Sequence, residues 1–116
     1  MREQIEKQYK EAGYFFPEMD KLIGGFRNKD LAKQMIEGLC IDGKLKKIDY
    51  QNYIHSQAME QAMSLLKKIL DEKGQITLAE YRDAIGTSRK YAMMLLEYAD
   101  REKLTKKTGD VRVRYQ

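Results

Sequence analysis

The chain has 116 residues, of which 42% are hydrophobic and 34% charged, a composition typical of globular proteins rather than disordered or membrane-spanning ones. No apolar run approaches the roughly 20 residues of a transmembrane helix, and the first residues lack the apolar core of a signal peptide. The single cysteine, Cys40, cannot form an internal disulfide, which indicates a cytoplasmic protein.

The first half of the chain predicts three short helices followed by a hairpin. Apolar residues at helical spacing predict helices over 2–11, 18–23 and 30–41, and Gly13 and Gly24 end the first two. Asn28 is the expected cap of the third helix. After a turn at 42–43, the stretch 44–54 predicts a first β wing.

The second half repeats this order with a longer first helix. Ser56 is the expected cap of a helix that runs to Lys73 and is closed by Gly74. A strand-like piece at 76–78, a short helix ending at Ile85 and a further helix that starts after Gly86 follow. In the last stretch, 104–115, valines alternate with arginines around a Gly-Asp turn, which predicts a hairpin with its cations on the outward face.

The helix after Gly86 opens with two cations where acids are normally found. Thr87 or Ser88 serves as a cap, but Arg89 and Lys90 follow at the positive end of the helix dipole. This charge pattern suits a helix tip that meets an anion such as a nucleic-acid phosphate. Two solvated surface cations are the simpler alternative. The basic wing that follows favours contact with an anion. The distribution of the net charge of +4 favours it too, because from Thr87 onward Lys and Arg outnumber Asp and Glu by eight to four.

An internal repeat divides the chain into two modules. Short patterns recur along the chain at nearly constant spacing. Phe16-Pro17-Glu18 corresponds to Leu78-Ala79-Glu80 at an offset of 62 residues, and Ala32 and Ile36 correspond to Ala92 and Leu96 at an offset of 60. Lys44-Leu45 corresponds to Lys103-Leu104 at an offset of 59. We predict a mostly α fold with small β wings, an α+β class made of two tandem winged-helix modules over 1–55 and 56–116. The first module's helix opens with Asn28-Lys29-Asp30, where the acid cancels the cation, so the second module is the expected nucleic-acid reader.

The sequence predicts no catalytic or metal site. It has no phosphate-binding glycine loop and no metal-spaced Cys/His cluster, so neither an enzyme nor a cofactor is expected. His55, the only histidine, is predicted to be structural or solvent-facing, and Cys40 a small buried hydrophobe. Tyr91 could stack on an unpaired base, but packing against Leu95 is favoured.

Residues 74–114 resemble the last winged-helix domain of the bacterial selenocysteine-specific translation elongation factor. The resemblance rests on Gly86-Thr87-Ser88-Arg89-Lys90-Tyr91-Ala92, Leu95-Leu96-Glu97-Tyr98, Asp100-Arg101 and Gly109-Asp110-Val111-Arg112. In that family a GTPase precedes four winged helices, and the last of these binds an mRNA stem-loop, the selenocysteine insertion element, next to a UGA codon.

The resemblance implies that this chain is a C-terminal RNA-binding fragment without the GTPase. It implies RNA contacts at the helix tip and in the wing, by Thr87, Ser88, Arg89, Lys90, Lys107, Arg112 and Arg114. The partners are then an mRNA stem-loop and, through the full-length factor, the ribosome, with a monomeric state and no membrane expected. A DNA-binding regulator and a protein-interaction module are the alternatives. Glu97 is the only charge over 91–99, which disfavours a helix lying along a DNA groove.

Overall fold

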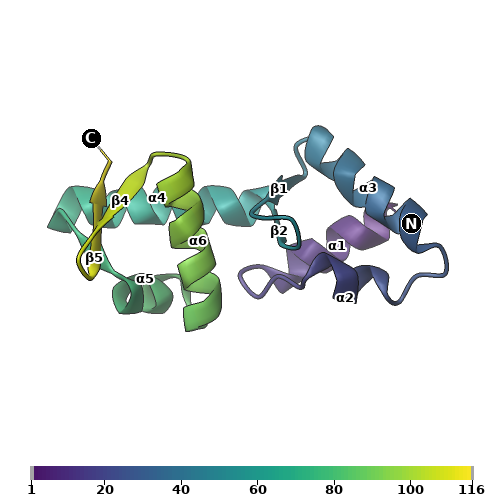
Figure 1. The fold of residues 1–116 in the computed structure, drawn as a ribbon, viewed down its shortest axis with the longest axis horizontal. Helices are drawn as coiled ribbons and strands as arrows, with labels where there is room; N and C mark the ends of the chain where they lie inside the picture. The colour runs from purple at the N-terminus through teal and green to yellow at the C-terminus, as the bar shows by residue number, and fades with distance from the viewer. Residues whose placement is uncertain (1, 116) are drawn as a thin grey trace. The chain divides into compact units, whose positions relative to one another are not determined.

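The computed structural model describes residues 2–115, which contain six α-helices and five β-strands (Figure 1). The chain forms two compact units, Met1–Met59 and Glu60–Gln116. The division therefore falls at Met59, a few residues beyond the boundary predicted from the repeat. No helix in the described part of the chain is long and apolar enough to cross a membrane.

The first unit contains the predicted three helices and hairpin. They are α1 (Arg2–Ala12), α2 (Met19–Ile23), α3 (Lys29–Ile41), β1 (Leu45–Lys47) and β2 (Tyr53–His55). The cap of α3 is confirmed, because the Asn28 side chain accepts a hydrogen bond from the Leu31 amide at 3.0 Å. Strands β1 and β2 pair antiparallel, with Leu45 opposite His55.

The core of the first unit is built mainly from the facing sides of α1 and α3. Ile5 and Tyr9 of α1 and Ile36 and Leu39 of α3 are completely buried. The Tyr9 ring meets the ring of Tyr53 from β2 edge to face, with centroids 6.5 Å apart. The wing is thus anchored on the helices by an aromatic pair.

The second unit contains three helices and a three-stranded antiparallel sheet. Its elements are α4 (Ser56–Lys73), whose first turn lies in the first unit, and β3 (Ile76–Thr77), α5 (Leu78–Ile85), α6 (Arg89–Arg101), β4 (Thr105–Thr108) and β5 (Val111–Arg114). The sheet order is β3-β5-β4, so β5 lies in the centre. Ser56 does not cap α4 as predicted, since it is the first helical residue and its hydroxyl donates to the Gly43 carbonyl at 2.6 Å.

Helix α5 is fixed at both ends. Thr77 and Glu80 form a reciprocal capping box, in which the Glu80 amide donates to Thr77 Oγ1 at 3.1 Å and the Thr77 amide to Glu80 Oε1 at 2.8 Å. Gly86 ends the helix with φ 72°, a left-handed conformation that favours glycine. In mid-helix the hydroxyl of buried Tyr81 donates to the Ala62 carbonyl of α4 at 2.9 Å. These contacts fix the two ends of α5 and hold the helix against α4.

Candidate nucleic-acid interface

The tip of α6 exposes the predicted hydroxyl and cationic residues. Ser88 occupies the N-cap position, yet its side chain makes no capping hydrogen bond. Ser88, Arg89 and Lys90 are exposed and Thr87 is half-buried. Lys90 Nζ lies 5.5 Å from the centroid of the half-buried Tyr91 ring, a cation–π contact. The first turn of α6 therefore presents positive charge at a helix start that the Ser88 side chain does not cap.

The register of the wing determines which of its residues face this tip. The turn at Gly109-Asp110 is confirmed, with φ 62° at Gly109. Lys107 of β4 stands opposite Arg112 of β5, so their side chains share one face of the hairpin. Val111 lies on the other face.

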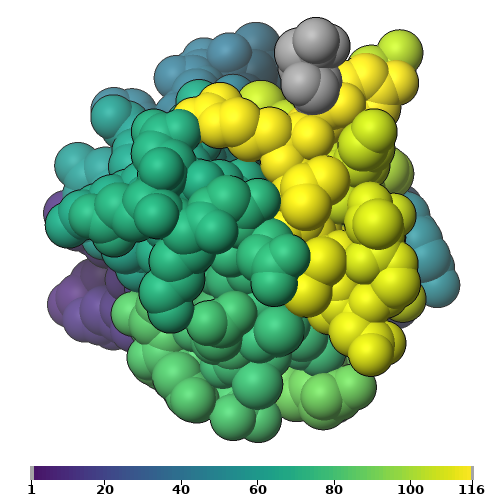
Figure 2. Space-filling model, turned by 90° about the vertical axis from the view of Figure 1, so that its left-hand side faces the viewer, coloured from purple at the N-terminus to yellow at the C-terminus, as the bar shows by residue number. Residues whose placement is uncertain are grey.

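The helix tip and the wing meet around a cavity of about 280 Å³. Arg89 and Met93 of α6 line one side, and Lys107, Asp110 and Arg112 of the wing line another. Figure 2 shows the wing, in yellow, running along the teal and green helices of this unit. Three of the predicted cations are thus brought to one place, and within the described residues neither Arg89 nor Lys107 forms an ion pair.

Arg112 does not face outward, so that part of the prediction is wrong. Only 4% of Arg112 is exposed, and its Nη2 and Nε donate to Asp100 Oδ2 at 3.0 and 3.3 Å. The Thr105 hydroxyl donates to the other oxygen of Asp100 at 2.7 Å. Because β5 is the central strand, one of its faces packs on the helices, and Arg112 lies on that face while Val111 and Val113 are half exposed. Arg112 links the wing to the end of α6.

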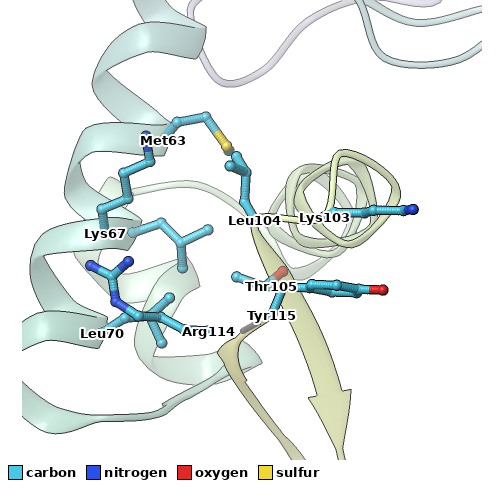
Figure 3. A pocket seen from close by; sticks show the side chains of 9 residues that line it. Met63, Lys67, Leu70, Lys103, Leu104, Thr105, Arg114 and Tyr115 are labelled. Carbon is cyan, nitrogen blue, oxygen red and sulfur yellow. The ribbon is translucent and has the colours of Figure 1, made fainter.

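Arg114 also departs from the predicted outward patch. It lies on the same face of β5 as Arg112, but at the base of the wing, and forms an ion pair with Asp71 of α4. Arg114 lines a separate cavity of about 370 Å³ with Lys67 and Lys103, and it reaches toward α4 (Figure 3). The predicted site therefore divides into a group at the wing tip and Arg114 at the wing base.

The start of α5 lies at the candidate site and was not predicted as part of it. Thr77, Leu78 and Ala79 line the same cavity as Arg89. The sequence carried a usable signal, because Thr77 followed three residues later by Glu80 is the pattern of a capping box. That pattern places a second helix N-terminus, but only the folded chain brings it beside the wing.

The remaining candidate residues have structural surroundings. His55 is buried, as the structural interpretation predicted, with Nε2 3.1 Å from Glu6 Oε2 and Nδ1 accepting from the Gln57 amide at 3.3 Å. Cys40 is only partly buried, and that burial raises the pKa of its thiol. Among residues 2–115 no three His, Cys, Asp or Glu side chains cluster as metal ligands.

Three helices followed by a basic hairpin whose tip meets the third helix define the second unit as a winged helix. Residues 68–114 match the family model described as the winged helix of elongation factor SelB. Over these residues the chain is similar to a winged-helix domain of SelB, which is a non-catalytic part of that factor.

Individual relatives agree with the family match. The chain is 30% identical over 114 residues to a selenocysteine-specific elongation factor of Desulfomicrobium baculatum, covering 97% of this chain and 18% of that protein. It thus spans less than a fifth of the length of this curated relative.

Two solved structures share the fold. The mRNA-binding domain of Escherichia coli SelB, solved in complex with SECIS RNA, matches with a TM-score of 0.67 at 22% identity, over 75% of this chain and 72% of that one. A bacterial selenocysteine-specific elongation factor, EF-Sec, matches with a TM-score of 0.75 at 17% identity, over 97% of this chain and 18% of that one.

Proposed function

We propose that the second unit binds an mRNA stem-loop of the selenocysteine insertion type through the tip of α6 and the tip of its wing. The observation that carries the proposal is the meeting of exposed Arg89 and Lys107 around one cavity. Thr87 and Ser88 directly before α6 and Lys90 in its first turn would add hydroxyl and cationic contacts to phosphates. The SECIS RNA in the E. coli SelB complex supports this class of ligand.

Arg112 has a different role in this proposal from the one its sequence pattern suggested. Since its guanidinium is held by Asp100, it would position the wing beside the helix tip and keep Lys107 in register with the ligand. Arg114, at the wing base, lies outside the proposed contact. The first unit repeats the order of helices and wing, and we propose that it is a second winged helix.

The proposed consequence of RNA binding is tethering. A-form RNA hides its base edges in a deep, narrow groove, so a small domain reads backbone shape and splayed loop bases. Holding a cytoplasmic selenocysteine-specific factor by such a stem-loop would raise its effective concentration at one UGA codon on the ribosome. A monomer would be sufficient for this role, which needs no catalytic group.

A gel-shift or anisotropy titration with a SECIS hairpin tests the proposal. We expect Arg89→Ala to weaken binding by roughly 10- to 100-fold, since a hydrogen bond to a charged group contributes about 1.5–3 kcal/mol. The slope of log affinity against log salt should fall by about 1. Lys107→Ala should have an effect of the same kind.

Arg101→Ala is the matched control, because it removes the same charge from the opposite end of α6. Equal affinities of Arg89→Ala and Arg101→Ala would refute the proposed site. Duplex DNA competing as well as the hairpin at one salt concentration would instead favour a DNA-binding regulator. Absence of any shift with nucleic acid would favour a protein-interaction module.

A further inference from the structure

The first unit has a cavity of about 430 Å³ between α3 and its wing, apart from the interface described above. Ile41 at the end of α3 and Tyr50 at the tip of the wing both line it, and they are 85% and 76% exposed. Single exposed apolar residues are ordinary, but two that border one cavity form an apolar opening. An aromatic and an aliphatic wall are the surroundings in which proteins hold an unpaired nucleobase.

The backbone that carries Tyr50 is fixed before any ligand arrives. Asp49 Oδ1 accepts from the amides of Gln51 and Asn52, each at 2.9 Å, and the Ile48 amide donates to the Asn52 carbonyl at 2.8 Å. This turn presents the Tyr50 ring on a rigid support. A preformed stacking surface lowers the ordering cost of binding.

The polar groups at the cavity suit a nucleotide. Lys33 of α3 and Lys47 of β1 are exposed and line it, and within residues 2–115 neither forms an ion pair. Gln51 Oε1 accepts from the Asp20 amide at 3.2 Å, which orients the Gln51 side chain and leaves its NH₂ group as a donor for a base edge. Glu37 is the one acidic residue of the lining. Two cations beside an apolar opening favour a phosphate-bearing ligand.

The internal repeat relates part of this cavity's lining to the cavity of the second unit. The structure relates the two units by an offset of 60 residues, not the 59 that the pattern Lys44-Leu45 and Lys103-Leu104 predicts for the wing, because the Lys44 amide donates to the Leu39 carbonyl as the Leu104 amide donates to the Ala99 carbonyl. This offset brings Lys33 to Met93 and Lys47 to Lys107. Met93 and Lys107 line the cavity between α6 and the second wing. Both units therefore have a hollow between the third helix and the wing, but in the first unit its walls are aromatic and aliphatic.

We propose that the first unit binds single-stranded RNA by taking one unpaired base between Tyr50 and Ile41, with the neighbouring phosphates on Lys33 and Lys47. This site lies in a different unit and would bind a different form of RNA from the stem-loop. The proposal therefore does not depend on the function proposed above. The contact is sequence-tolerant, because every base has a face that stacks.

The only cysteine of the chain provides a reporter, since Cys40 lines this cavity. Alkylation of Cys40 by iodoacetamide would be followed on the full chain with and without hexanucleotides of A, C or U. We expect saturating oligonucleotide to slow alkylation several-fold. Tyr50→Ala should weaken binding about tenfold, the loss of one base stack, with the fold intact because Tyr50 is exposed. Phe15→Ala, which removes another exposed ring outside the cavity, is the matched control.

Three results would overturn the proposal: no protection of Cys40 by any of the three oligonucleotides, equal binding by Tyr50→Ala and Phe15→Ala, or equal protection by poly-glutamate. The last would assign the cavity to an acidic protein partner. Arg89→Ala separates the two sites, because it should weaken hairpin binding while protection of Cys40 by hexanucleotides stays unchanged.

Discussion

The buried ion pair between Asp100 and Arg112 makes an asymmetric prediction about stability. Asp100→Ala leaves a guanidinium that is 5% exposed without its carboxylate, and it also removes the acceptor of the Thr105 hydroxyl. Breaking a buried pair from one side costs about 3–5 kcal/mol. Because the Asp100 side chain is 27% exposed, water can reach the vacated place, and we expect a cost at the lower end, about 3 kcal/mol.

The opposite substitution should be milder. Arg112→Met keeps most of the buried side-chain stem, and Asp100 retains the Thr105 hydroxyl and access to water. We expect a loss of about 1 kcal/mol, the net value of a typical hydrogen bond. Asp100→Ala should therefore destabilise the second unit more than Arg112→Met, although each removes one partner of the same pair.

Amide hydrogen exchange on the full chain measures this difference, because peptides from β5 and α6 report the stability of the second unit separately from the first. Equal or greater destabilisation by Arg112→Met would refute the reasoning, as would unchanged exchange in β5 for Asp100→Ala. RNA binding gives a second reading. Since Arg112 is assigned a positioning role, Arg112→Met should change hairpin affinity far less than Arg89→Ala.

Three further predictions concern single residues. Gly86→Ala forces a Cβ into a conformation with φ 72° and should destabilise the second unit by about 1–2 kcal/mol, measured by the same exchange experiment. Hydrogen bonds from the Thr77 amide, and then from Lys73, hold the pKa of Glu80 below its ordinary value of 4.5. The contribution of the Glu80 carboxylate to stability is therefore complete above pH 4.5 and is lost as the pH falls through the lower pKa of the folded state. The NMR chemical shift of the Thr77 amide should follow this loss, and in Glu80→Gln it should not change over the same pH range. Burial is the main cause that raises the pKa of the Cys40 thiol. The alkylation rate of Cys40 should therefore rise with pH at a higher midpoint than that of a free thiol. A midpoint at or below the free-thiol value would contradict this prediction.

Much of the fold could be predicted from the sequence because its signals are local. Asn28 at the start of α3, and Gly74 and Gly86 after α4 and α5, mark helix ends through hydrogen bonds and backbone angles that depend on few neighbours. Ser56 shows the limit of such reasoning. Its hydroxyl had a distant acceptor in Gly43, which no local pattern reveals.

The wing shows why the site was harder to predict. Alternation establishes that Arg112 and Val113 point to opposite faces of β5, but it does not say which face packs on the helices. Hydrophobicity favoured the valines. The partner that reverses the choice is Asp100, which neutralises Arg112 and lies in another element. Only the tertiary contact decides between the two faces.

The resulting division of the cations limits what electrostatics can contribute to RNA binding. With Arg112 paired to Asp100 and Arg114 to Asp71, the cations left near the helix tip are Arg89, Lys90 and Lys107. Three phosphate contacts correspond to a salt slope of only about −2 to −3. Affinity for one stem-loop must then depend on the shape of the RNA and on splayed bases at the cavity between α6 and the wing. An RNA of the same charge whose loop is replaced by a continuous helix should therefore lose most of its affinity.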